Sequence, residues 1–301
     1  MAFEFDSLID RRRLKRRLTF WRSLAALALL MLLIVAAGRL DLAPGRPHIA
    51  RITIDSVITE DHERESLLNR IAKTGDIKAL IVRINSPGGT TAGSEALFEA
   101  IRQVAKHKPV VATIGTVGAS GGYLAALAAD YVVARETSIT GSIGVLYESP
   151  QFSELLKKLG IGVDKVASGP LKGEPSPLHP MTDAVRAATQ DVVDDTYEWF
   201  VKLVAERRKL DMDEARKLAD GRIYTGHQAV TKSLVDALGG ETTARAWLAE
   251  TRGIPRNLSV VDMDASPGQR LLEQVTQTMF GKTLFPERLT LDGLLSLWHP
   301  E

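Results

Sequence analysis

The chain has 301 residues, of which 25% are charged, and its formal net charge is +1. This composition suits one or two globular domains, excludes a wholly disordered chain and gives no argument for a nucleic-acid partner. The sequence contains no cysteine, which excludes disulfides, thiolate metal sites and a cysteine nucleophile.

The N-terminal segment predicts a membrane anchor. Residues 11–17 read R-R-R-L-K-R-R, and an unbroken apolar run follows at 24–38. With Phe20 and Trp21, this run approaches the roughly 20 residues that span a bilayer. The basic cluster before it predicts a cytoplasmic N-terminus. We therefore expect a single pass through the cytoplasmic (inner) membrane, with the rest of the chain in the periplasm.

Two other interpretations of the apolar run stay open. Its core is short enough for the apolar region of a signal peptide, and the V-A-A-G at its end offers small residues for cleavage. A buried core helix is the other alternative, although no soluble helix needs the cations before it. The favoured interpretation has a basic cytoplasmic N-terminus at 1–19, a transmembrane signal anchor at 20–38 and a linker at 39–48.

After the linker, apolar β-branched runs alternate with helical patterns. This order predicts an α/β domain with largely parallel strand pairing. Strands are expected at 49–58, 78–85, 109–115, 131–134 and 142–146, and helices at 61–74, 91–106 and 121–130.

The second half of the chain is more helical. A long amphipathic helix is expected at 182–208, opened by the cap signal T-D. Shorter helices at 213–220 and 241–252 and a last strand at 256–263 follow. Residues 49–265 then form one domain and 266–301 a C-terminal tail, whose two short apolar patterns either pack on this domain or contact another subunit or the membrane.

The first candidate for chemistry is Ser120, in G-A-S-G-G (118–122). The motif fits G-x-S-x-G, with a strand expected before it and a helix after it. Glycines permit a sharp turn and a close approach of substrate to the backbone. The N–H of Gly121, at a helix start, is placed to stabilise an oxyanion. The alternative is a serine that caps the helix, with glycines for close helix–strand packing.

The second candidate is the turn I-N-S-P-G-G at 84–89, which ends a strand. Such a turn exposes backbone N–H groups, which can donate to a substrate carbonyl or hold an extended peptide. Gly89, or second to it Gly88, is the candidate for a second oxyanion donor. A plain Pro-Gly turn is the alternative.

A serine nucleophile also needs a base. His179 and His227 lie downstream, as the order of an α/β-hydrolase requires, but neither has a convincing acidic partner. A lysine can replace histidine when it is neutral, because burial disfavours the ammonium form. Lys172 lies in a loop of small residues, glycines and prolines, S-G-P-L-K-G-E-P-S-P (168–177). A solvated surface charge is the alternative for it.

Taken together, these segments resemble the signal peptide peptidase A (protease IV) family of bacterial membrane-anchored serine proteases, in its short single-domain form. The motifs come in the family's order over residues 49–245. They are N-S-P-G-G (85–89), G-A-S-G-G-Y (118–123), T-G-S-I-G-V (140–145), G-P-L-K-G-E-P-S-P (169–177), and G-R-I-Y-T-G (221–226) followed by L-V-D-A-L-G-G (234–240).

The resemblance implies a Clp-protease/crotonase-like α/β fold and a Ser–Lys dyad. In it Ser120 is the nucleophile, Lys172 the general base, and Gly121 with the Gly88–Gly89 turn the oxyanion hole, while Ser142 hydrogen-bonds the lysine amine. No metal or cofactor is required. The resemblance also implies a ring- or dome-like homo-oligomer with the dyad completed across a subunit boundary. Ser120 and Lys172 of one chain are then too far apart to bond.

The sequence departs from the family pattern at two positions. Ser233 stands where the family usually has a glycine before L-V-D, a residue that would suit a left-handed helix end. Leu124 follows Tyr123 where the family often has a second aromatic residue. Neither position belongs to the dyad.

The resulting expectation is a Ser–Lys peptidase domain at 49–265 on a membrane anchor. Its substrates would be hydrophobic peptides, such as signal peptides left in the membrane after cleavage. A crotonase-type acyl-CoA enzyme would share the fold and the oxyanion turn, but it explains neither the anchor nor Ser120. A catalytically silent membrane scaffold or partner-binding module also stays open.

Overall fold

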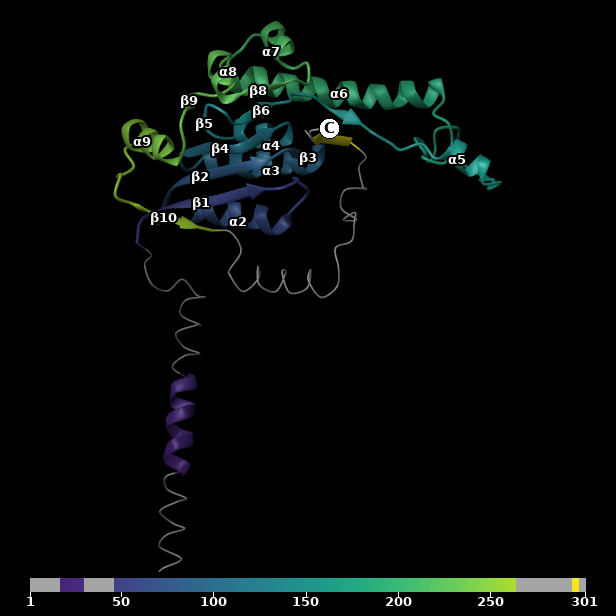
Figure 1. Cartoon of the computed structure of the whole chain (residues 1–301). Helices are drawn as coiled ribbons and strands as arrows, with labels where there is room; N and C mark the ends of the chain where they lie inside the picture. The colour runs from purple at the N-terminus through teal and green to yellow at the C-terminus, as the bar shows by residue number, and fades with distance from the viewer. Residues whose placement is uncertain (1–16, 30–45, 264–293, 298–301) are drawn as a thin grey trace, which may run out of the picture. The chain divides into compact units, whose positions relative to one another are not determined.

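The computed structural model describes residues 17–29, 46–263 and 294–297 (Figure 1). The chain divides into two units, Met1–Arg46 and Pro47–Glu301. In the first unit, residues 17–29 form an exposed helix. No helix among the described residues is both long and apolar enough to cross a membrane. Residues 30–38 of the expected anchor lie outside the described residues.

The second unit is built on a parallel sheet with the strand order β10-β1-β2-β4-β5-β9. A further strand, β6, pairs in parallel with β4 and antiparallel with β8. The expected α/β domain with largely parallel pairing is confirmed. The strands are β1 (His48–Asp55), β2 (Ile77–Ser86), β4 (Val110–Ala119), β5 (Tyr131–Ala134), β6 (Ile139–Gly141), β8 (Ile223–Thr225), β9 (Ala237–Leu238) and β10 (Ser259–Asp262).

Helices lie on both faces of this sheet, which explains the nearly continuous apolar runs of its central strands. Side chains such as Ile52 and Ile84 face a core that also contains residues of several helices. Ile81 and Val111 face the opposite core, which Leu248 joins. The first core is covered by α2 (His62–Lys73), α3 (Thr91–Ala105), α4 (Gly121–Leu127), α6 (Asp183–Arg208) and α7 (Met212–Leu218), and the second by α9 (Glu241–Arg252).

A second, small sheet has the order β3-β11-β7, with β11 antiparallel to both neighbours. Its strands are β3 (Gly88–Thr90), β7 (Leu146–Tyr147) and β11 (Leu294–Leu297). The single strand predicted at 142–146 is wrong, because β6 ends at Gly141 and β7 begins at Leu146. Ser142 has a φ of 49°, a left-handed conformation that a strand does not accommodate.

Two sequence motifs meet where α4 and α6 approach the start of β9. The Tyr123 hydroxyl donates to the Leu234 carbonyl oxygen at 2.8 Å. Asp236 accepts from the Val132 N–H at 2.7 Å and pairs with Arg208 at 2.8 Å. Ser233 has a φ of 58°, so the left-handed conformation that a glycine would suit is adopted here by a serine. The motifs G-A-S-G-G-Y and L-V-D are thus joined through their buried polar groups.

Candidate active site

Ser120 occupies a sharp turn between β4 and α4. Its φ of 54° and ψ of −120° lie in a region that residues other than glycine rarely adopt. The turn is held on one side by β6, because the Ser120 N–H donates to the Gly141 carbonyl oxygen at 2.7 Å. Backbone strain of this kind is concentrated at functional sites, and a strained strand-to-helix turn is the conformation of a nucleophile elbow.

The helix-capping alternative for Ser120 is not what the structure contains. Ser120 precedes α4, but its side chain makes no capping hydrogen bond to the helix. Close packing does occur beside it, since a Cβ atom on Gly122 would lie 2.6 Å from the Ser86 carbonyl oxygen. The glycines of the motif therefore do serve helix–strand packing, while the serine does not serve as a side-chain cap.

The two candidate oxyanion segments lie next to each other. A Cβ atom added to Gly121 would be 3.2 Å from the amide nitrogen of Gly89 and 2.2 Å from Ser94 Oγ. Gly89 is equally confined, because its own Cβ would lie 1.8 Å from the Ile58 carbonyl oxygen. Only glycine fits at either position. The fold thus brings the turn after β2 against the start of α4.

Within that turn, Gly88 and Gly89 differ. Gly88 has a φ of 113°, and its N–H donates to Ser86 Oγ at 3.2 Å inside the turn. The Gly88 carbonyl oxygen accepts from the Ile58 N–H at 2.8 Å. The N–H of Gly88 is therefore already engaged, which favours Gly89 over Gly88 as a donor to a substrate.

Ser142 lies one residue beyond the carbonyl that holds Ser120. It is 9% exposed, and its N–H donates to the Arg222 carbonyl oxygen at 2.8 Å. Ser120 and Ser142 therefore lie on adjacent chain segments, which are joined by the hydrogen bond from the Ser120 N–H to the Gly141 carbonyl oxygen.

Lys172 lies in a turn of the loop between α5 (Ser153–Lys158) and α6, and it is exposed. Its N–H donates to the Gly169 carbonyl oxygen at 3.2 Å. Within the described residues its side chain has no hydrogen bond or ion pair. Among the described residues, nothing in this chain buries Lys172. The nearby carboxylate of Glu174 pairs instead with Lys165 at 2.6 Å, which holds the pKa of Glu174 below its usual range.

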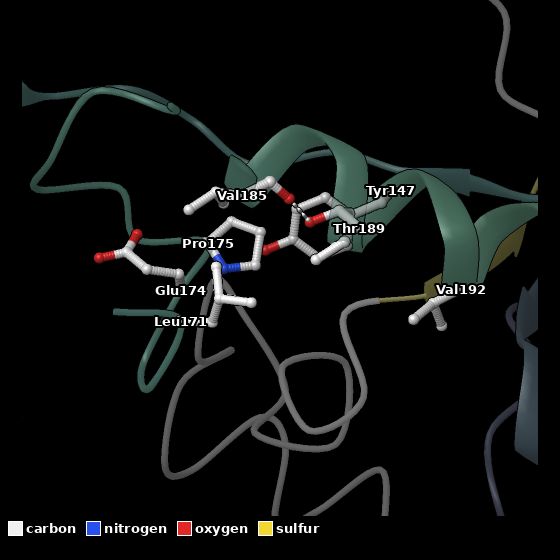
Figure 2. A pocket seen from close by; sticks show the side chains of 8 residues that line it. Tyr147, Leu171, Glu174, Pro175, Val185, Thr189 and Val192 are labelled. Atoms are coloured by element: carbon white, nitrogen blue, oxygen red, sulfur yellow. Dashed lines mark hydrogen bonds between the residues drawn. The ribbon is translucent and has the colours of Figure 1, made fainter. Parts of the chain in front are cut away.

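An apolar cavity of about 210 Å³ lies beside this loop (Figure 2). Leu171 and Pro175 border it from the loop that carries Lys172, and Tyr147 of β7 and the first turns of α6 complete its wall. The lining residues are Tyr147, Leu171, Glu174, Pro175, Val185, Ala188, Thr189 and Val192. The same strand, β7, pairs with β11.

Sequence reasoning missed two features at this site. One is β11, which lies along the oxyanion turn with Ser296 opposite Gly89 and Leu297 opposite Gly88. In the sequence, only the short apolar pattern around Leu295 indicated that this segment contacts other parts of the protein. The other is Ser94 in α3, fully buried against Gly121, for which a lone serine in a helical pattern gives no signal. Among the described residues, no group of His, Asp and Glu could hold a metal ion.

Comparison with known proteins agrees with this geometry. The model of peptidase family S49 matches residues 102–255, just over half of the chain. A protein of Synechocystis sp. that is named as a protease is 35% identical to this chain, over 74% of this chain and 80% of its own length. The chloroplastic serine protease SPPA of Arabidopsis thaliana is 32% identical over 77% of this chain and 35% of its own length. Protease 4 of Haemophilus influenzae is 34% identical over 58% of this chain and 28% of its own length. The chain therefore spans well under two thirds of these last two relatives.

Solved structures give more distant likenesses. A membrane-bound stomatin-specific protease has a TM-score of 0.49 at 13% identity, covering 74% of this chain and 100% of its own. ClpP1 from Listeria monocytogenes has a TM-score of 0.42 at 14% identity, covering 63% of this chain and 91% of its own. Scores below 0.5 support no inference about fold or activity. The family match and the relatives suffice for the conclusion: the chain belongs to peptidase family S49, the signal peptide peptidase A (protease IV) family of serine-type peptidases.

Proposed function

We propose that the chain is a membrane-anchored serine endopeptidase whose Ser–Lys dyad is completed between neighbouring copies. The observation that carries this proposal is the strained turn at Ser120, which lies beside the contact between Gly121 and Gly89. A nucleophile next to two backbone donors is the arrangement that acyl transfer requires. An acyl-CoA enzyme would need the donors but not the strained serine, and a silent scaffold would need neither.

The base in this proposal is Lys172 of a neighbouring copy. Its exposure and its lack of a side-chain partner within the described residues support a role that is fulfilled outside its own chain. The surface around it supports the same role, because a soluble chain rarely exposes so many large apolar side chains in one segment without a partner to cover them. These exposed residues are Phe152, Leu155, Leu159, Ile161, Val163, Val166, Leu171 and Leu178.

The reaction then follows the general scheme of a serine nucleophile with a lysine base. The neutral amine of Lys172 takes the proton from Ser120 Oγ, and Oγ attacks the carbonyl carbon of the scissile peptide bond. The N–H groups of Gly121 and Gly89 stabilise the oxyanion. The lysine gives its proton to the leaving amine as the C–N bond breaks. Water then attacks the acyl carbon while the lysine accepts its proton, and the lysine returns that proton to Ser120 Oγ as the acyl C–Oγ bond breaks. In this scheme Ser142 hydrogen-bonds the lysine amine.

An extended, apolar peptide is the substrate that the surroundings of the site favour. A strand, β11, already lies antiparallel to β3 at Gly88–Thr90, so the edge of the oxyanion turn accepts main-chain pairing. Peptides that bind by strand addition gain affinity from the main chain and specificity from side-chain pockets. The apolar cavity beside β7 suits a hydrophobic side chain. Cleaved signal peptides combine these properties, and the basic, apolar N-terminal segment would hold the enzyme on the membrane that contains them.

Labelling with a fluorophosphonate probe tests the proposal. The intact oligomer should react at one residue, and labelling should be lost in Ser120→Ala and in Lys172→Ala. The control is Lys209→Ala, which removes a lysine outside the proposed site. An oligomer that takes up no probe, or one that keeps its labelling after Ser120→Ala, would contradict the proposed nucleophile.

A further inference from the structure

Ser94 carries a buried hydroxyl group that has no hydrogen-bond partner among the described residues. The residue is 0% exposed in the first turns of α3. Its Oγ makes no hydrogen bond within the part of the chain that the structure describes. A serine in a helix usually turns its hydroxyl to solvent or donates to the carbonyl four residues earlier. Ser94 does neither. Because an unsatisfied buried hydroxyl destabilises a folded chain, its presence needs a specific explanation.

The position of Ser94 supplies one. Its Oγ would be 2.2 Å from a Cβ on Gly121, so the hydroxyl lies directly against the Cα of that glycine. The same Cβ position is 3.2 Å from the amide nitrogen of Gly89. Ser94 therefore lies against Gly121, on the side from which the Gly89 nitrogen also approaches that residue.

We infer that Ser94 is a third donor of the oxyanion hole, an inference that rests on the proposed function. Among the described residues of the free chain, its hydroxyl has no acceptor. When Ser120 attacks, the substrate carbonyl oxygen becomes negatively charged between Gly89 and Gly121, and it then accepts a hydrogen bond from Ser94. A donor that is already in place interacts more strongly with a full negative charge than with the ground-state carbonyl. Ser94 therefore accelerates the chemical step and contributes little to substrate binding.

This role predicts that activity and stability change in opposite directions. In the full-length oligomer, Ser94→Ala should lower kcat about 10- to 100-fold, toward the effect of losing one oxyanion donor. KM for an apolar reporter peptide should stay unchanged. The unfolding midpoint should stay the same or rise, because the substitution removes an unsatisfied buried hydroxyl. Ser94→Cys, which keeps a weak donor of similar size, should give an intermediate kcat.

The matched control is Ser138→Ala. Ser138 is also a buried serine, 1% exposed, but its hydroxyl donates to the Gly115 carbonyl oxygen at 2.5 Å. Its replacement should lower the unfolding midpoint and leave kcat close to the wild-type value. Ser94→Ala with a wild-type kcat, or with a lower midpoint and a raised KM, would overturn the inference.

The failure of the Ser94 inference can be told apart from the failure of the proposed function. If Ser120→Ala retains activity, the proposed nucleophile is wrong, whatever Ser94→Ala does. If Ser120→Ala is inactive while Ser94→Ala and Ser94→Cys both keep the wild-type kcat, only the role of Ser94 is wrong.

Discussion

Replacing Gly121 by alanine should damage both the fold and the oxyanion hole. The added Cβ would stand 2.2 Å from Ser94 Oγ, 3.1 Å from Ser94 Cβ and 3.2 Å from the Gly89 nitrogen. Contacts under 3.0 Å force a shift, and overpacking of this kind costs about 1–3 kcal/mol of stability. The shift would move the N–H groups of Gly121 and Gly89 apart. Loss of one oxyanion donor lowers kcat about 100- to 1,000-fold, and we expect a decrease of that size.

The assay is urea unfolding together with steady-state hydrolysis of an apolar peptide. Gly75→Ala is the control, because beyond its chain neighbours no atom of the described residues lies within 4 Å of the Cβ that it would add. In the double variant Ser94→Ala/Gly121→Ala, the closest contact is gone, so stability should return in part. Its kcat should stay low, because the Ser94 hydroxyl is missing as well. A Gly121→Ala enzyme with full stability and full kcat would refute the reasoning about this contact.

Three further predictions concern the regions around the site. The pKa of Glu174 is lowered mainly by its hydrogen bond from Lys165. The ion pair therefore stabilises the fold above the usual pKa of a glutamate, and this stabilisation is lost as the pH falls through the lowered pKa of Glu174. In Lys165→Met, the decrease in the unfolding midpoint over that acidic range should be absent. Leu295→Pro should weaken the pairing of β11 with its neighbouring strands. If substrate peptides compete with β11 for the edge of β3, KM should fall, whereas an unchanged KM would exclude this competition. Tyr123→Phe removes the bond to Leu234 and should cost about 1 kcal/mol in urea unfolding; an unchanged midpoint would contradict that role.

The parallel α/β core could be predicted from the sequence because its signals are local. Runs such as K-A-L-I-V-R-I-N are apolar and β-branched on both faces, and the helices between them carry their own periodicity. The cap at Thr182 was predicted from T-D, and its side chain does accept the Val185 N–H at 3.3 Å. Strand ends that depend on tertiary contacts were harder to predict. The break between β6 and β7 follows from the left-handed conformation of Ser142, which residues other than glycine rarely adopt.

The candidate site was predictable only as far as its motifs carried local chemistry. Gly121 is confined mainly by the Ser94 side chain and Gly89 by the Ile58 backbone, and only glycine fits at either position. Ser94 could not be predicted from the sequence, because its proposed role depends on its contact with Gly121, which is distant in the sequence. The relation of Lys172 to Ser120 was also beyond local patterns. A lysine that is exposed in one chain can be a base only where another surface covers it.

Mixing two inactive variants tests the shared dyad most directly. Ser120→Ala and Lys172→Ala chains, each inactive alone, are unfolded, combined in equal amounts and reassembled, and fluorophosphonate labelling is then measured. If each site joins Ser120 of one copy to Lys172 of the next, about a quarter of the sites in a randomly mixed ring regain both residues, so labelling should return to that fraction. Wild-type chains taken through the same procedure give the reference. Mixed oligomers that form normally but remain unlabelled would contradict a dyad completed between copies.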